Sequence, residues 1–155
     1  MGRGNITDED KQSNTDAVAE YPNCFGCGQD NPIGLRLDLR LEGDRLRASF
    51  TPQEAHQGWP GTVHGGIITA LLYEIMENLM YRQGTTTMMR GMETKLRSPA
   101  SVGKKLLVEA WLKSQEGREL TVHSELKDAD GKLIAQGTAS LVVLNQEQID
   151  RLGLG

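Results

Sequence analysis

The residues best suited to do chemistry lie between positions 61 and 74, where two adjacent glycines precede an apolar run that ends in an acid. Gly65 and Gly66 carry no side chain, so a ligand can approach the backbone closely at both positions. Amides in the first turn of a helix have no partner within the helix, and they lie at the positive end of its dipole. Such amides can stabilise a carbonyl oxygen that becomes negative during a reaction.

Glu74 is the acid, and it follows Gly66 by two helical turns among apolar residues. Burial among apolar groups raises the pKa of a carboxyl group, which suits it to act as a general base or a nucleophile. His64, directly before the glycines, can orient water or can cap the helix. Gln57, on the preceding loop, is a further candidate to position water, and His56 on the same loop could take the place of a missing acid. Each feature also has an ordinary structural explanation, namely packing for the glycines and a solvated helix flank for the acid.

Cys24 and Cys27 have the C-x-x-C spacing that is found in zinc sites and in redox-active thiol pairs. A closed zinc site needs four ligands, and the sequence has no second C-x-x-C or H-x-x-x-H pattern. We therefore expect no metal here, and a turn that carries two small, half-buried thiols.

The hydrophobic pattern predicts which elements position these residues. From 63 to about 82, apolar residues recur at spacings of three, four and seven, which is typical of a helix with one buried stripe. Alternation of apolar and polar residues predicts half-buried strands before and after this helix. The expected strands cover about 35–41, 46–50, 85–96, 106–113, 120–126 and 132–144, and a short helix is expected within 146–152.

This order of elements predicts an α+β fold, in which an antiparallel sheet of about six strands wraps around one long central helix. Gly137, Ala139 and Ser140 in the last strand indicate close packing against a bulky neighbour, which the helix can supply. Residues 1–20 are polar and acidic, and we expect them to form a flexible lead-in. Residues 21–155 then form a single domain.

Charge and hydropathy exclude several classes of protein. The 155-residue chain has a net charge of -4, and its 17 Lys and Arg are scattered among 21 acids, which argues against nucleic-acid binding. No apolar run approaches the ~20 residues of a membrane helix, so we expect no membrane association. The first ten residues contain no apolar signal core, and together with the low cysteine content this predicts the cytoplasm.

Three motifs resemble a known family: CFGCG at 24–28, NPIGL at 31–35 and HGG at 64–66. Together with the order of elements, they resemble the hotdog-fold acyl-CoA thioesterases, and most closely the PaaI-like and 4-hydroxybenzoyl-CoA-thioesterase-like branch. The resemblance extends from about residue 21 to residue 144.

The resemblance implies hydrolysis of acyl-CoA or related acyl thioesters, with coenzyme A as part of the substrate and no separate cofactor. It implies a homodimer or homotetramer whose sites lie between two subunits. In such sites the amide that matches Gly65 polarises the thioester carbonyl, and a helix carboxylate activates water or attacks directly. Substrate contacts are expected from Gly66, His56, Tyr73, from Met89 in the acyl tunnel and from Arg97 near coenzyme A.

Two positions depart from the family pattern. The family's carboxylate usually lies nine residues after the HGG histidine, where this chain has Tyr73, a phenol of ordinary pKa ~10 and thus a poor base. Glu74 follows one residue later, turned by ~100° around the helix. The polar residue often found six positions before the histidine is Gly58, with Gln57 beside it.

Two functions therefore remain open. In the first, Glu74 serves as base or nucleophile, the Gly65 amide binds the oxyanion, and Gln57 or His64 positions water. In the second, the protein binds acyl-CoA without cleaving it, as a sensor or carrier. A hotdog dehydratase or hydratase is a third alternative, but it requires a different Asp/His pairing, which we do not find.

Overall fold

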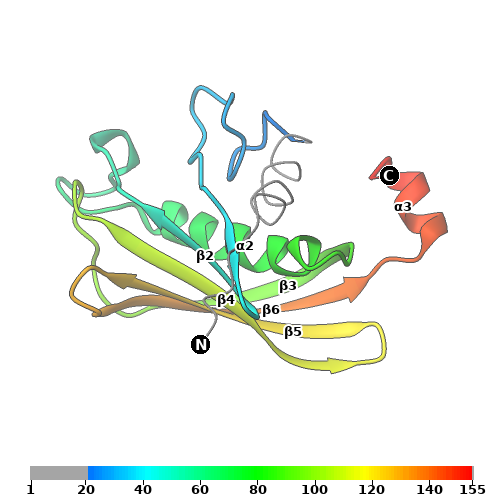
Figure 1. Ribbon diagram of the computed structural model, residues 1–155. Helices are drawn as coiled ribbons and strands as arrows, with labels where there is room; N and C mark the ends of the chain where they lie inside the picture. The colour runs from blue at the N-terminus through cyan, green and yellow to red at the C-terminus, as the bar shows by residue number, and fades with distance from the viewer. Residues whose placement is uncertain (1–20, 155) are drawn as a thin grey trace, which may run out of the picture. The chain divides into compact units, whose positions relative to one another are not determined.

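The structure is a computed structural model that describes residues 21–154 (Figure 1). The predicted flexible segment 1–20 lies outside the described residues. The chain forms two compact units, and the boundary between them falls after Leu37.

The described part of the first unit, residues 21–37, is a loop built from tight turns. The Cys24 amide donates to the Tyr21 carbonyl at 3.1 Å, and the Gly28 amide donates to the Cys24 carbonyl at 2.9 Å. A Cβ atom at Gly28 would collide with the Pro22 carbonyl oxygen, so this turn requires glycine. Cys24 is half-buried, as the sequence predicts for this turn, whereas Cys27 is buried.

The strand predicted over 35–41 is wrong for its first five residues. Leu35 and Leu37 are buried and Arg36 is exposed, so the alternation predicts burial correctly. The Leu35 and Leu37 amides, however, donate to carbonyl oxygens of the preceding loop instead of a neighbouring strand. Arg36 has a φ of 52°, a left-handed conformation that interrupts an extended strand.

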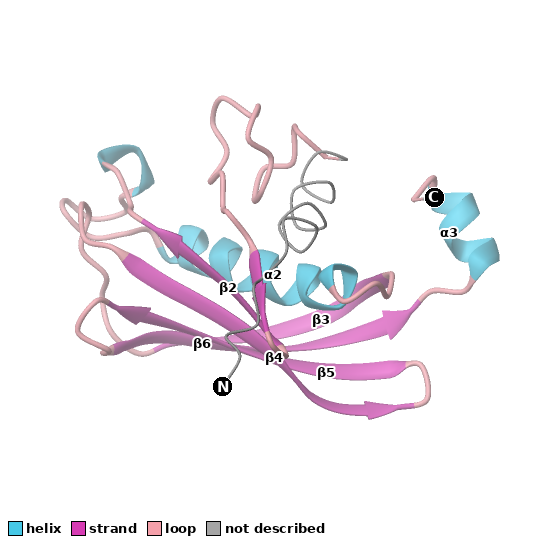
Figure 2. Ribbon diagram, in the orientation of Figure 1, coloured by secondary structure: helices cyan, strands magenta, loops and turns pink. Residues whose placement is uncertain are grey.

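The second unit consists of one antiparallel sheet and the helix that packs on it (Figure 2). The strands follow the order β1-β2-β4-β5-β6-β3, so that β1 and β3 form the two edges. This confirms the predicted α+β fold with six strands. The strands are β1 (Arg40–Glu42), β2 (Arg45–Phe50), β3 (Thr87–Leu96), β4 (Leu106–Glu116), β5 (Glu119–Asp128) and β6 (Leu133–Val143); the helical elements are η1 (Glu54–His56), α2 (Gly65–Arg82) and α3 (Gln146–Leu152).

Helix α2 lies across one face of the sheet (Figure 1) and buries the predicted apolar stripe. The stripe packs against the inward-facing residues of the strands, which alternate with outward-facing polar ones. The helix ends at Arg82, and Gly84 follows with a φ of 88°, as the sequence predicts for a helix stop. No helix in the described part of the chain is both long and apolar enough to cross a membrane. The buried stripe comprises Ile68, Leu71, Leu72, Ile75, Met76 and Leu79.

Gly137 on β6 is the point of close packing that its sequence context predicts. A Cβ atom there would lie 2.7 Å from Ser124 Oγ and 2.9 Å from Met76 Cε on α2. We expect Gly137→Ala to lower the free energy of unfolding by about 1–3 kcal/mol, because the core must shift to admit the methyl group. Urea unfolding measures this change.

The double variant Ser124→Ala/Gly137→Ala is the matched control for this prediction. It removes the closer of the two obstructing atoms, so part of the lost stability is expected to return. Unchanged stability in the single variant would show that the core is looser than the packing around Gly137 indicates.

Candidate functional site

The first turn of α2 leaves one backbone amide for a ligand. His64 is the N-cap residue, and its Nδ1 accepts a hydrogen bond from the Gly66 amide at 2.8 Å. The Ile67 and Ile68 amides donate to the His64 carbonyl oxygen at 3.0 and 3.2 Å. For the Gly65 amide, no acceptor is found among residues 21–154. A donor at the positive end of an 18-residue helix is thus available to a ligand.

The HGG motif has a local structural reason. A Cβ atom on Gly66 would lie 2.9 Å from His64 Nδ1, so glycine at this position lets the imidazole fold back over the helix end. Because Nδ1 accepts a hydrogen bond, it carries no proton. The structure thus shows His64 as a helix cap, and its role toward water remains a prediction.

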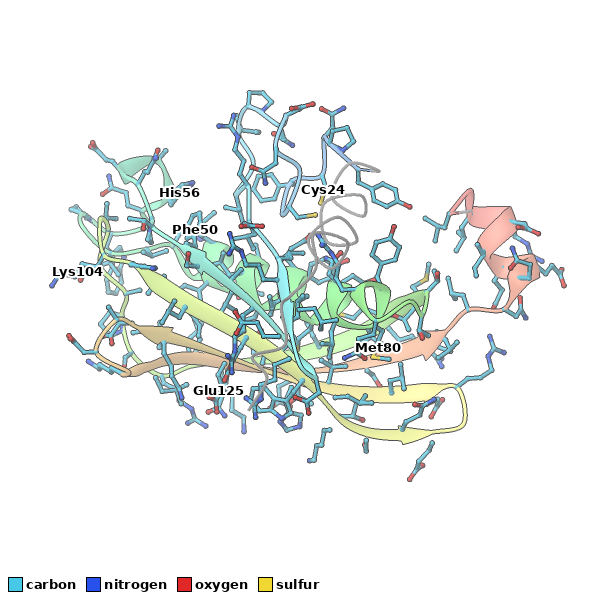
Figure 3. The ribbon with its side chains drawn as sticks, in the orientation of Figure 1. Cys24, Phe50, His56, Met80, Lys104 and Glu125 are labelled. Carbon is cyan, nitrogen blue, oxygen red and sulfur yellow. The ribbon has the colours of Figure 1, made fainter. Side chains whose placement is uncertain are left out.

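The loop before α2 is held together by the two other polar residues that the sequence singles out. Gln57 Oε1 accepts from the Gly61 amide at 3.1 Å, and His56 Nδ1 accepts from the Gln53 amide at 2.9 Å. The His56 ring also packs on Phe50, with 5.1 Å between ring centroids (Figure 3). These contacts fix the loop in front of Gly65. The roles of Gln57 and His56 toward water or substrate remain predictions.

Gly65 lines a pocket of about 540 Å³. This volume falls within the range of small-molecule sites, roughly 300–1,000 Å³. Trp59 and Leu96 line it while remaining 80% and 58% exposed, so its walls are apolar and open to solvent. Arg97 lies at its edge, where Nε donates to Gln136 Oε1 at 2.7 Å. The pocket thus combines an apolar wall, one cation and one unused amide.

Helix α2 carries two acids, of which the sequence analysis identified only Glu74. Glu74 is buried, 7% exposed, and its Oε1 accepts from Asn78 Nδ2 at 2.9 Å. Glu77, one turn further on, was missed; its Oε2 accepts from the Met89 amide of β3 at 3.1 Å. Burial raises the pKa of Glu77, the charge of Glu74 raises it further, and the Met89 hydrogen bond opposes both.

Edge strand β3 follows the flank of α2 from Gly65 to Glu77. At one end, Leu96 Cδ1 lies 3.3 Å from the position that a Cβ atom on Gly65 would take. At the other end, the Met89 amide binds Glu77. Tyr73 is 43% exposed and lies one helical turn before Glu77. The two side chains therefore lie on the same side of the helix. Met89 is half-buried, and its predicted role in an acyl tunnel remains a prediction.

A single chain cannot bring the Gly65 amide and an acid of α2 to the same atom. At 1.5 Å per residue, Gly65 and Glu74 are about 14 Å apart along the helix axis, and Gly65 and Glu77 are about 18 Å apart. A thioester carbonyl and the water that attacks it lie within hydrogen-bonding distance of their catalytic groups, about 3 Å. A site that uses both groups therefore needs a second copy of the chain.

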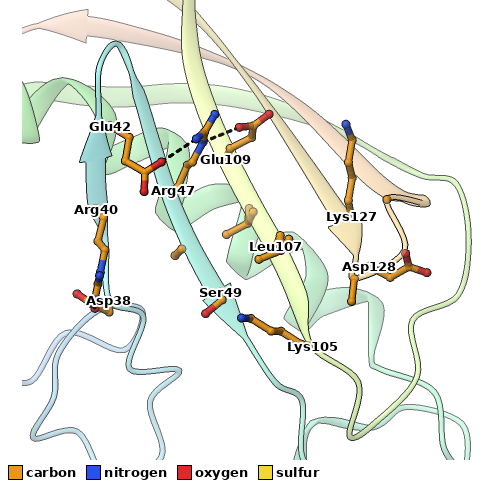
Figure 4. A pocket seen from close by; sticks show the side chains of 14 residues that line it. Asp38, Arg40, Glu42, Arg47, Ser49, Lys105, Leu107, Glu109, Lys127 and Asp128 are labelled. Carbon is orange, nitrogen blue, oxygen red and sulfur yellow. Dashed lines mark hydrogen bonds and ion pairs between the residues drawn. The ribbon is translucent and has the colours of Figure 1, made fainter.

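A larger hollow, of about 640 Å³, lies on the outward face of the sheet (Figure 4). Ion pairs occupy much of its wall: Arg47 contacts Glu42 at 2.7 Å and Glu109 at 3.0 Å. Such paired, exposed charges are typical of a solvated sheet surface. The hollow contains none of the sequence-predicted site residues, and we do not assign the reaction to it.

Comparison with known proteins bears on the family and the fold. Residues 60–135 match the model of the thioesterase superfamily. No curated protein matches the chain.

Three solved structures illustrate the likeness of the fold. The PaaI protein of the E. coli phenylacetic acid degradation operon shares 16% identity at a TM-score of 0.74, over 87% of this chain and 95% of that one. A thioesterase superfamily protein shares 21% identity at a TM-score of 0.74, over 92% and 81%. A hypothetical thioesterase from Streptococcus pneumoniae TIGR4, solved with coenzyme A, shares 13% identity at a TM-score of 0.66, over 71% and 87%. The hotdog fold predicted from the motifs is confirmed.

Proposed function

Since the hotdog domain of this chain belongs to the thioesterase superfamily, we propose that the protein hydrolyses acyl-CoA thioesters to a free acid and coenzyme A. The observation that carries the proposal is the Gly65 amide, which is unused among the described residues and belongs to a residue that lines a pocket of about 540 Å³. The coenzyme A in the Streptococcus pneumoniae structure supports the choice of ligand. Substrate of this kind is met in the cytoplasm, which is where we place the protein.

In the proposed reaction, the thioester carbonyl oxygen accepts a hydrogen bond from the Gly65 amide. Negative charge grows on this oxygen as water attacks the carbonyl carbon, and the amide and the helix dipole stabilise that charge. A helix carboxylate takes the proton from water. The carbon–sulfur bond then breaks, and the departing thiolate of coenzyme A takes up the proton from the carboxylate. Arg97, at the pocket edge, attracts the phosphates of coenzyme A.

We further propose that two copies form the site by pairing their β3 edges. The ten-residue β3 has a sheet partner only on its β6 side within the described chain, so its other edge can pair with a second strand. Two-fold antiparallel pairing about the middle of β3 sets the Leu96 end of one strand beside the Met89 end of the other. Gly65 of one copy then approaches the helix acids of its partner. Two such dimers can form a tetramer.

Binding without cleavage is the alternative function, and Tyr73 is the observation that favours it. A phenol of pKa ~10 is a poor base at neutral pH, so a site that relied on Tyr73 would hold acyl-CoA without hydrolysing it. Hydrolysis and binding without cleavage both predict that the protein binds acyl-CoA. Only hydrolysis predicts that coenzyme A is released.

An acyl-CoA panel with a free-thiol readout tests the proposal. We expect release of coenzyme A from at least one of several short-chain, long-chain and aromatic acyl-CoA esters, at a turnover of about 1 s⁻¹ or more. Calorimetric titration with free coenzyme A measures binding separately. Binding with no thiol release from any ester would favour the carrier or sensor, and an absence of both would contradict the proposed ligand.

A further inference from the structure

We propose that Glu77, and not Glu74, is the general base that takes a proton from the attacking water. The inference rests on the proposed hydrolysis and adds a catalytic residue to it. The proton moves from water to Glu77 while the water oxygen bonds to the acyl carbon. It passes to the thiolate sulfur as the carbon–sulfur bond breaks.

The position of Glu77 on the flank of α2 is the first argument. Gly65 and Glu77 lie near opposite ends of β3: a Cβ atom on Gly65 would lie 3.3 Å from Leu96 Cδ1, and Glu77 Oε2 accepts from the Met89 amide. The pairing of two β3 edges brings these opposite ends together, one from each copy. Glu77 of one copy is thereby placed toward the Gly65 amide of its partner.

The hydrogen bonds of the two acids are the second argument. Met89 holds Glu77 Oε2, and for Glu77 Oε1 no donor is found within residues 21–154, which leaves that oxygen to accept a proton from water. Glu74 is 7% exposed, and its Oε1 already accepts from Asn78. A base must reach its proton directly, and Glu77 is the more accessible of the two acids.

The chemistry of a half-buried carboxylate is the third argument. Loss of water around Glu77 raises its pKa, which makes the ionised form a stronger base. The charge of Glu74 on the same helix raises the pKa of Glu77 further. β3 contributes the Met89 amide, whose hydrogen bond opposes the rise in the pKa and so favours the ionised form.

The test compares Glu77→Gln with wild type in the full-length chain. We expect the rate of coenzyme A release to fall by about 100-fold or more, because general-base catalysis contributes 10²–10⁴-fold. Glutamine retains the shape of the side chain and can accept the Met89 hydrogen bond. The dissociation constant for free coenzyme A, measured by calorimetry, is expected to stay the same. The rate of the wild type is expected to rise with pH through the raised pKa of Glu77, and this rise should vanish in the variant.

Loss of fold is separated from loss of chemistry by a stability measurement. Because the pKa of Glu77 is raised, the native state holds this proton more tightly than the unfolded chain does, and wild type loses stability as the pH rises through that pKa. The glutamine side chain of the variant is neutral and avoids this loss. The melting temperature of Glu77→Gln at pH 7 is therefore expected to equal or exceed that of wild type.

Two further variants make the outcome decisive. Glu147→Gln changes an exposed acid on α3, away from α2, and should retain wild-type turnover. Glu74→Gln tests the acid that the sequence favours. If Glu77→Gln retains turnover, whatever Glu74→Gln does, the proposal for Glu77 is overturned and the hydrolase remains. If wild type binds coenzyme A but releases none from any acyl ester, the proposed hydrolysis fails and this inference fails with it.

Discussion

Replacing Gly65 with proline is expected to lower the rate of thioester hydrolysis by about 100-fold to 1,000-fold, because the substitution deletes the amide that binds the oxyanion. The first position of a helix is the one place where proline is well tolerated, since the lost N–H makes no bond within the helix. His64, the residue before it, has φ -60° and ψ 134°, which is the extended conformation that a following proline requires. The substitution therefore removes the N–H from the site, adds the three ring carbons of proline, and is expected to leave α2 intact.

Gly65→Ala is the matched control. It retains the amide and adds one methyl group, whose nearest neighbour is the flexible end of Leu96 at 3.3 Å. We expect alanine to reduce turnover far less than proline does, with coenzyme A release measured by thiol titration and folding checked by circular dichroism. Equal losses in both variants would point to a steric requirement at Gly65 and against a role for its amide.

The sequence predicts the elements of this fold well because periodicity alone reports burial. The apolar stripe of α2 and the alternation in β4 to β6 each require one packed face, whatever the distant neighbours are. Leu35 and Leu37 show the limit of this reasoning. The alternation of apolar and polar residues correctly predicts that both side chains are buried. The backbone at Arg36, however, is left-handed, and the strand begins only at Arg40. Side-chain pattern does not specify which backbone partner an amide takes.

Less of the candidate site can be predicted, because its geometry depends on which strand borders each flank of the helix. The HGG motif identifies the helix start and the unused amide of Gly65. Glu77, by contrast, has the same helical signature as any other flank residue, and its significance depends on the Met89 amide of β3. The one available signal was its spacing of four residues from Tyr73, which places both side chains on one stripe.

A heterodimer made from two inactive variants is expected to recover about half of wild-type turnover, since one of its two sites combines the intact Gly65 of one copy with the intact Glu77 of the other. One copy carries Gly65→Pro and the other Glu77→Gln. Co-expression with two different affinity tags and sequential purification isolates the mixed species. Its coenzyme A release is then compared with that of each homodimer.

The recovery follows from the length of α2, which separates the amide and the acid of one chain by about 18 Å. If both groups of a site came from the same chain, each copy in the heterodimer would remain defective and turnover would stay at the level of the homodimers. A dimer in which both copies carry Gly65→Pro, each with a different affinity tag, is the control for the purification. Turnover in the mixed species thus reports directly whether the oxyanion donor and the base act across the β3 edges of two chains.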